Sequence, residues 1–248
     1  MDLNILTFEQ LDSTNSEAAR QARQGAAEGL CVLARQQTDG RGRHGRNWVS
    51  GKDSGLYFSV VLRPAIEQRA MPLITLMAGV AVHDTLLEFG LKPDIKWVND
   101  VLVGEKKISG ILSELIETRG GPAVIVGIGI NLGTSALADE IANIATSIGS
   151  ETHKIVEPED VAKVLTRNLS HFYDILNRPD GPAEIIGHWQ KRSTYFQGKR
   201  VSVTLENEML NGTTDGLEDN GALRLKTADG GIRIIQAGDV QRLRESLD

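Results

Sequence analysis

The chain has 248 residues, which is enough for one catalytic domain and a small second domain. Apolar residues make up 40% of the sequence, which excludes a globally disordered chain. The formal net charge of −6 argues against nucleic-acid binding by the whole surface, although a local basic patch stays possible. The single cysteine, Cys31, excludes an internal disulfide, and we expect it to be a small buried hydrophobe.

The N-terminal segment MDLNILTFEQLDST carries acids and glutamine where a signal peptide would have positive charge and a long apolar stretch. No segment approaches the roughly 20 apolar residues that a membrane-spanning helix needs. We therefore expect a soluble, cytoplasmic protein without a membrane partner.

The first part of the chain is expected to alternate between strands and helices. Thr14 with Glu17 fits a capping box, so a helix should begin there and end near Gly25. Apolar residues recur at helical spacing from Pro72 to Gly90, which predicts a helix packed on a sheet. Strands are predicted at 3–8, 30–37, 56–63, 95–97, 108–115 and 123–132, and further helices at 158–176 and 182–192.

After Gln197 the pattern changes to short β runs (RVSVTL, ALRLKT, GIRIIQ) between glycine-bearing turns (NGTTDG, EDNG, ADGG). Short strands at regular spacing predict a small barrel of about fifty residues. We therefore predict a first domain at residues 1–194 and a second domain at residues 195–248.

A segment rich in glycine and arginine, GRGRHGR at residues 40–46, is the strongest local signal. Its glycines can let successive backbone N–H groups converge on an anion, and its arginines add planar donors for phosphate or carboxylate. We expect the empty loop to be mobile, because glycine gives it many conformations and repulsion among its cations keeps it open, and we expect an anionic ligand to order it. A solvated basic loop and a nucleic-acid contact are the alternatives. Arginine/glycine-rich tails that bind nucleic acid are usually repetitive and unstructured, whereas this segment is short and bracketed by strands.

A second polar cluster lies on a predicted hairpin whose turn is at residues 104–105 (KWVND…KKISG). Asn99 could simply close a turn, whereas Asp100 could hold magnesium or a ribose. Lys107 begins an otherwise apolar strand, where a cation serves a ligand better than a core.

Two further signals each have a structural alternative. Gly127 and Gly129 alternate along a predicted strand, so a flat ligand or a closely packed helix could lie against that face. The run Ser13-Thr14-Asn15 could cap a helix or offer donors to a ligand. The five histidines show no metal-ligand spacing.

Taken in order, DSTN, QTDGRGRHGRNW, LYFSVVLRP, KWVNDV with KKISGILSEL, and VGIGINL closely resemble the biotin protein ligase family, from about residue 5 to residue 240. The resemblance implies an α+β fold. Its catalytic domain would have a mixed, largely antiparallel sheet packed with helices, as in class II synthetases, and a C-terminal SH3-like β-barrel would follow. Val98 departs from the family's usual proline in this motif, which removes a rigid φ but no chemical group.

The family's activity is activation of biotin with ATP to biotinyl-5′-AMP, followed by transfer to a lysine of a biotin carboxyl carrier protein, with Mg²⁺. The resemblance implies biotin contacts at Ser13, Thr14, Asn15, Gln37, Arg41, Gly42, Arg43, Lys107, Gly110, Gly127 and Gly129. It implies nucleotide contacts at Arg43, Trp48, Asn99, Asp100 and Asn131, and catalytic roles for Lys107, Arg41 and Arg43. The metal contact at Asp100 is a hypothesis from the type and place of that residue, not from the resemblance.

Some members of this family also carry an N-terminal DNA-binding domain. The ligase motifs begin here at Ser13, so we expect no DNA partner, while a homodimer formed through a sheet edge stays open. Three rival hypotheses are a lipoate or octanoyl transferase, a biotin sensor without catalysis, and a nucleic-acid binder. Lys107 and the complete GRGRHGR segment favour the ligase over the sensor.

Overall fold

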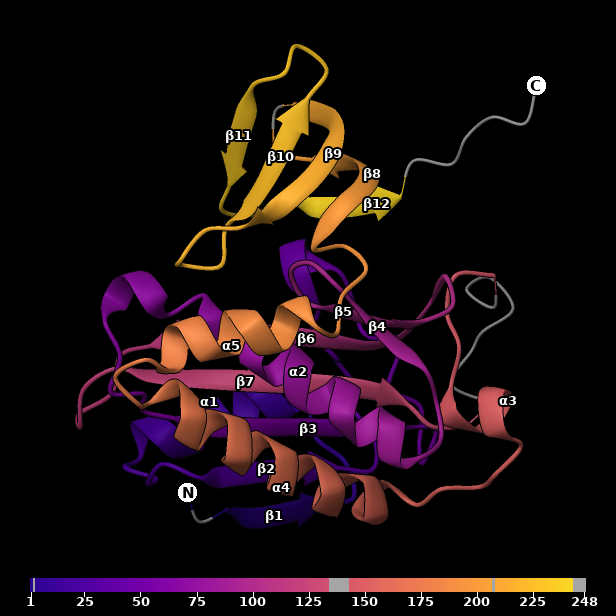
Figure 1. The fold of residues 1–248 in the computed structure, drawn as a ribbon. Helices are drawn as coiled ribbons and strands as arrows, with labels where there is room; N and C mark the ends of the chain where they lie inside the picture. Colours follow the sequence, from indigo (N-terminus) through magenta and orange to yellow (C-terminus); the bar gives the residue numbers. More distant parts are fainter. Residues whose placement is uncertain (2, 134–142, 207, 243–248) are drawn as a thin grey trace.

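The computed structural model describes residues 1, 3–133, 143–206 and 208–242, and it contains two sheets (Figure 1). The larger has the order β1-β2-β3-β7-β6-β5-β4, in which β1 and β2 are parallel and all other neighbours antiparallel. Its strands are β1 (Asn4–Phe8), β2 (Leu30–Ala34), β3 (Gly55–Leu62), β4 (Pro93–Lys96), β5 (Asp100–Val103), β6 (Lys106–Ile116) and β7 (Ala123–Asn131).

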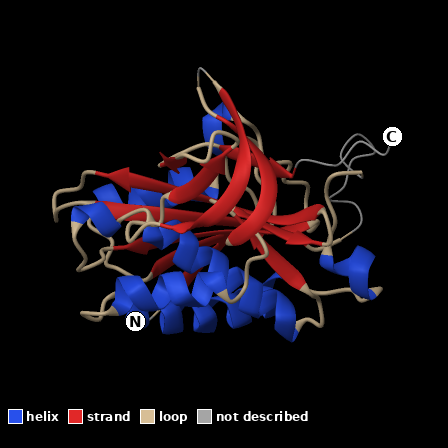
Figure 2. Ribbon diagram, turned by 45° about the horizontal axis from the view of Figure 1, so that its top comes forward, coloured by secondary structure: helices blue, strands red, loops and turns tan. Residues whose placement is uncertain are grey.

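Helices cover both faces of this sheet. Their bounds are α1 (Thr14–Arg23), α2 (Leu73–Glu88), α3 (Ile148–Thr152), α4 (Pro158–Leu176) and α5 (Gly181–Gln190), with short 3₁₀ turns at Arg43–Gly45 and Gln68–Ala70. Helices α2, α4 and α5 lie together on one face (Figures 1 and 2) and share its large apolar core. Helix α1 packs on the other face through Ala18 and Ala22.

The alternation of strand residues assigns each side chain to one of these faces. On β7, Val126 and Ile128 belong to the core beneath α2, whereas Ile125 belongs to the smaller core beneath α1. Gly127 and Gly129 therefore also face the α1 side of the sheet. Cys31 is buried in the larger core, and this burial raises the pKa of its thiol to about 12.

The C-terminal part is a five-stranded antiparallel sheet of order β11-β10-β9-β8-β12. Its strands are β8 (Gln197–Thr204), β9 (Met209–Leu217), β10 (Leu223–Thr227), β11 (Ile232–Ile235) and β12 (Asp239–Arg242). The α+β class, the mixed sheet and the small C-terminal β domain are confirmed. The division between residues 194 and 195 stays a prediction.

Three local predictions need correction. The capping box is wrong, because Ser13 is the N-cap, makes no side-chain cap bond, and Thr14 turns to Gln37 instead. The strand predicted at 30–37 ends at Ala34. The predicted turn NGTTDG lies within β9, where the backbone is paired with both β8 and β10. Gly212 permits that pairing, because a Cβ there would lie 2.6 Å from Lys226 O.

The sequence patterns did not predict helix α3 or strand β12. Strand β5 was predicted only as one arm of the hairpin. Among the described residues, no helix combines the length and the apolar character needed to cross a membrane.

Candidate functional site

A cavity of about 330 Å³ lies on the α1 side of the larger sheet, and its floor is made of glycine. Gly110 of β6 pairs in register with Gly129 of β7, and Gly127 pairs with Leu112 one row further along. Glycines in these rows leave the backbone bare, which lets a flat group approach the sheet. The same row continues to Asp100 on β5, which pairs with Gly110.

Every residue predicted to contact biotin or nucleotide lines this cavity, although the residues come from strands, a helix and loops far apart in sequence. They are Ser13, Thr14, Asn15, Gln37, Arg41, Gly42, Arg43, Trp48, Asn99, Asp100, Lys107, Gly110, Gly127, Gly129 and Asn131. The structure therefore brings together the whole predicted set, while its ligand contacts stay a prediction.

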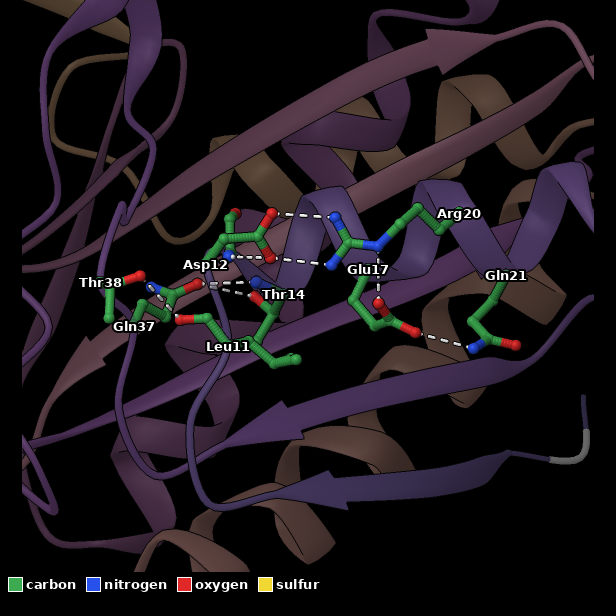
Figure 3. Close-up of polar contacts among 9 residues, drawn as sticks. Leu11, Asp12, Thr14, Glu17, Arg20, Gln21, Gln37 and Thr38 are labelled. Atoms are coloured by element: carbon green, nitrogen blue, oxygen red, sulfur yellow. Dashed lines mark hydrogen bonds and ion pairs between the residues drawn. The ribbon is translucent and has the colours of Figure 1, made fainter.

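The first turn of α1 forms one wall through a buried hydrogen-bond network. Gln37 Oε1 accepts from Thr14 N at 2.8 Å and from Thr14 Oγ1 at 3.2 Å (Figure 3). Ser59 Oγ on β3 donates to Asn15 Oδ1 at 2.6 Å and lies 2.8 Å from Thr14 Oγ1. A Cβ at Gly127 would lie 2.0 Å from Asn15 Oδ1, so the wall and the glycine floor are matched.

Residues 40–48, here called the flap, cover the glycine floor as a closed loop. Gly42 N donates to Arg46 O at 2.7 Å, and Trp48 N donates to Gly40 O at 2.8 Å. The flap glycines are needed for this close approach, because a Cβ at Gly40 would lie 2.3 Å from Trp48 O. We predicted converging N–H groups, but the amides of Gly42, Arg46 and Trp48 instead close the loop on itself.

The flap arginines pair with protein acceptors, so the expected open loop is not what the structure shows. Arg41 forms a two-bond ion pair with Glu114 on β6, at 3.0 and 2.8 Å. Arg46 pairs with Asp239 of β12 at 2.7 Å. These carboxylates neutralise the repulsion that we expected to keep the flap open.

Arg43 lies deeper than the other flap arginines. Its guanidinium donates to Asn99 Oδ1 at 2.9 Å and to Gly238 O at 3.4 Å, and lies 3.7 Å from Asp239. Burial lowers the pKa of Arg43, and Asp239 and Asp100 oppose that shift. An arginine stays charged despite such a shift, so Arg43 presents a partly desolvated cation to the cavity.

Trp48 was predicted to lie on the nucleotide side, but its ring covers the glycine floor. A Cβ at Gly129 would lie 2.5 Å from the Trp48 ring, and Lys107 Nζ lies 5.4 Å from the ring centroid. Trp48 therefore borders both the floor and the lysine. Its Nε1 is buried and makes no hydrogen bond within the described residues.

Asn99 and Asn131, also predicted on the nucleotide side, are tied to backbone. Asn99 Nδ2 donates to Ile111 O at 3.0 Å, and Asn131 Nδ2 donates to Thr146 O at 2.9 Å. The hypothesis that Asn99 only closes a turn is therefore incomplete. Its side-chain amide donates to β6 through Ile111 O and accepts from Arg43 of the flap. The Trp97–Val98 peptide bond just before it is cis.

Asp100 lies between two ammonium groups. One oxygen lies 2.6 Å from Lys107 Nζ and the other lies 2.9 Å from Lys96 Nζ. Burial opposes the ionisation of Asp100, but the charges and hydrogen bonds of Lys107 and Lys96 outweigh it and lower the pKa of this carboxyl. The three groups form an ionised cluster with one excess positive charge facing the cavity.

This cluster does not fit a magnesium ion held by the protein. Mg²⁺ takes carboxylate and water oxygens, and both oxygens of Asp100 already face lysines. Within the described part of the chain, no group of three His, Cys, Asp or Glu side chains is placed to hold a metal. The predicted metal contact at Asp100 is therefore not supported by the donor set.

Sequence reasoning missed several residues that build the site. Ser59 sits within an apolar strand, and Glu114 follows the Gly110 motif by four residues on the same face of β6. That strand spacing could have revealed Glu114. No local signal connects Asp239 to the flap, because 193 positions separate it from Arg46.

Comparison with known proteins agrees with this site. Residues 7–131 match the biotin/lipoate A/B protein ligase family, and residues 196–243 match the biotin protein ligase C-terminal domain. The chain belongs to the biotin/lipoate A/B protein ligase family. Within that family it is a biotin protein ligase, as the match to the C-terminal domain and the relatives below establish.

The chain is 35% identical to the biotin–[acetyl-CoA-carboxylase] ligase of Paracoccus denitrificans, covering 92% of this chain and 96% of that one. It is 33% identical to the bifunctional ligase/repressor BirA of Bacillus subtilis, covering 97% and 74%. The solved biotin protein ligase from Aquifex aeolicus in complex with biotin and ATP is 30% identical and superposes with a TM-score of 0.84, covering 97% and 99%.

Proposed function

We propose that this protein activates biotin with ATP, forming biotinyl-5′-AMP and pyrophosphate, and then transfers the biotin to a lysine of an acetyl-CoA carboxylase carrier domain. One observation carries the proposal. Three cationic side chains, Lys107, Arg41 and Arg43, border a single slot whose floor is glycine backbone, and Asn15 and the Trp48 ring lie against that floor. A flat, uncharged ring system fits between Asn15 and Trp48, and two anionic reactants need such cations.

The slot has a reactive end and a closed end. Lys107 and Asp100 lie at one end, beside Gly110, whereas Asn15 lies over Gly127 further along the strands. In this proposal the ring of biotin lies between Asn15 and Trp48, and its carboxylate points towards Lys107. The nucleotide lies on the side of Arg43 and Asn131.

The first step needs no general base from the protein. A carboxyl group like that of biotin has a pKa near about 4.3, so it is already an anion at neutral pH. The barrier comes from repulsion between this anion and the α-phosphate of ATP, and from the need for in-line alignment. Lys107 and Arg43 supply fixed positive charge for both reactants, whereas Arg41 is paired with Glu114 and holds the flap.

The second step requires an acceptor lysine to lose its proton, because its pKa is near about 10.4 in the free state. Asp100 is a poor acceptor for that proton, since its pKa is lowered by Lys107 and Lys96. We therefore assign Asp100 the role of orienting these two ammonium groups. Between the two steps, the flap shields the adenylate from water.

ATP–pyrophosphate exchange tests this proposal. The purified protein is supplied with labelled pyrophosphate and ATP, together with biotin, lipoate or neither. We expect exchange with biotin alone. Exchange with lipoate alone would identify a lipoate enzyme instead, and biotin binding without exchange would identify a sensor. Magnesium is included in each reaction as the counter-ion of the nucleotide, with no residue assigned to it.

A further inference from the structure

Glu114 joins the flap to the wall of the slot without lining the cavity itself. Its carboxylate accepts two bonds from Arg41, at 3.0 and 2.8 Å, and a third from Asn15 Nδ2 at 2.8 Å. Arg41 belongs to the flap and Asn15 to helix α1. A single acid on β6 thus connects two elements that border the cavity from different sides.

The register of the sheet places Glu114 at the closed end of the slot. Gly110, Leu112 and Glu114 alternate on the same face of β6, and Glu114 pairs with Ile125 on β7. Ile125 packs against α1 in the smaller core, which fills the space beyond. Glu114 lies about 13 Å from Gly110 along the strand, by the usual rise of an extended chain.

Charge divides the flap between two anchors. Arg41 is held by Glu114 at the closed end, whereas Arg43 and Arg46 face Asp239 at the other end. Without the charge of Glu114, the remaining ion pairs of the flap would all lie at the Asp239 end. Arg41 would then leave the slot's closed end uncovered.

We infer that Glu114 is a positioning residue that latches the flap over bound biotin, through Arg41, and orients Asn15 at the same time. This inference rests on the proposed function. The side chains of Arg41 and Glu114 are 44% and 28% exposed, so the ion pair is weak enough to open for substrate and is screened by salt. The Arg41–Glu114 contact must hold the flap closed over biotin and must also break to let biotin enter, and a partly exposed two-bond ion pair can do both.

Two substitutions separate the charge from the hydrogen bonds. Glu114→Gln keeps an oxygen that can accept from Asn15 but removes the charge that holds Arg41. Glu114→Ala removes both the ion pair with Arg41 and the hydrogen bond from Asn15. We expect Glu114→Gln to raise the KM for biotin about threefold and Glu114→Ala about tenfold, with the exchange rate at saturating biotin changed by less than about twofold. A residue needed only for folding would lower the exchange rate at saturating biotin, through loss of active protein, and would leave the KM for biotin unchanged.

Leakage of the adenylate gives a second readout. The protein is incubated with biotin, ATP and serum albumin, which lacks an acceptor domain, and biotin attached to albumin lysines is measured from low to high salt. We expect leakage from the wild type to rise with salt as the ion pair is screened. Glu114→Gln should leak more than the wild type already at low salt and should rise less with salt, because only the pairs of Arg43 and Arg46 with Asp239 remain to be screened.

Glu218→Gln is the matched control. Glu218 pairs with Arg224 in the β domain at 2.6 Å, and its side chain is similarly exposed. This variant should match the wild type in KM, in leakage and in the salt response. Melting temperatures establish that each variant is folded, and the wild-type salt series needs no variant.

The outcomes separate the inference from the function beneath it. A wild type that shows no biotin-dependent exchange overturns the proposed function and this inference together. A wild type that exchanges normally but leaks independently of salt, or folded Glu114 variants with the wild-type KM, overturn the latch alone.

Discussion

At the scale of single residues, the cavity depends on how a few charges are balanced. Asp100 is ionised and lies against Lys96 and Lys107, so the cluster keeps one net positive charge. That charge is well placed to meet a carboxylate and a phosphate. The lysine nearest the glycine floor carries the larger part of this role, because Gly110 lies against its side chain.

Removing that ammonium should slow adenylate formation severely. For Lys107→Ala we expect a loss of about 3 kcal/mol of transition-state stabilisation, which is about a hundredfold or more in rate. Pyrophosphate exchange at saturating biotin and ATP measures it. Lys106→Ala is the control, because Lys106 is exposed and does not line the cavity. Undiminished exchange in Lys107→Ala would contradict the assignment.

Residue types were the most predictable part of the site. Glycine in a strand and lysine at the start of an apolar strand are out of place in a core, so their chemistry stands out locally. Their partners were not predictable. Arg41 and Glu114 lie 73 positions apart, and any acid on the same face of a neighbouring strand would have suited the sequence equally well.

At the scale of elements, the glycine rows of β6 and β7 set the shape of the slot. A side chain at Gly127 would overlap Asn15 Oδ1, and one at Gly129 would overlap Trp48. Both contacts lie on the cavity side of the sheet, whereas the opposite side is packed in the larger core. The floor is therefore a property of strand alternation.

Gly127→Ala should raise the KM for biotin by about tenfold or more, because the new methyl group displaces Asn15 from the wall. Pyrophosphate exchange at varied biotin measures this change. Gly187→Ala in helix α5 is the matched control, since no atom lies within 4 Å of its added Cβ. It should leave the KM unchanged and stabilise the fold by about 0.5–1 kcal/mol. Equal KM values for the two variants would contradict a glycine floor.

Elements with strong periodicity were predicted well, and those that depend on distant partners were not. Helix α2 lies within the predicted range of 72–90, although it is buried on nearly all sides and the predicted apolar position Leu87 is 47% exposed. The β6 and β7 predictions are confirmed within a few residues. Strand β9 was mistaken for a turn because polar residues and glycine dominate it. Its pairing on both sides overrides that local preference.

One ion pair ties helix α2 to the segment after α5. Asp84 accepts from Arg192 at 2.7 and 2.8 Å and from His83 at 2.9 Å. Burial opposes ionisation, but these hydrogen bonds outweigh it and lower the pKa of Asp84 to about 2. Because the folded pKa lies below the ordinary value, the stabilisation is present above about pH 4 and is lost as the pH falls.

Asp84→Asn should therefore change how stability depends on pH. The difference in unfolding free energy between wild type and variant should shrink by about 2 kcal/mol in total on acidification, with about half of that loss reached at pH 3. Urea denaturation at pH 7, 5, 4 and 3 measures it. Adding Arg192→Gln to the variant should have a smaller effect than in the wild type. A pH-independent difference would contradict the lowered pKa.

At the scale of the whole molecule, the two sheets meet at the flap. Gly238, Asp239, Val240 and Gln241 of the C-terminal domain line the cavity alongside the catalytic sheet. Trp97 Nε1 donates to Gly221 O at 2.9 Å and fixes the docking nearby. The sequence predicted both domains but not this junction, because composition and periodicity describe each domain separately.

The junction predicts that the C-terminal domain acts on the nucleotide end of the flap. Asp239 faces Arg43 and Arg46, and Arg43 also contacts Asn99. Asp239→Asn should raise the KM for ATP about threefold, because Arg43 loses an opposite charge that keeps it in place, and should leave the KM for biotin within about twofold. Asp215→Asn, which alters the Arg224 pair elsewhere in the domain, is the control.

Pyrophosphate exchange at varied ATP and at varied biotin, measured on the same preparations, gives both KM values and tests this prediction. The two anchors of the flap should then separate by substrate, because Glu114 lies at the closed end of the slot and Asp239 lies beside Arg43 at the other. Glu114→Gln should affect biotin, and Asp239→Asn should affect ATP. If Asp239→Asn raised both KM values equally, the flap would move as one rigid body, and the division of its anchors would be wrong.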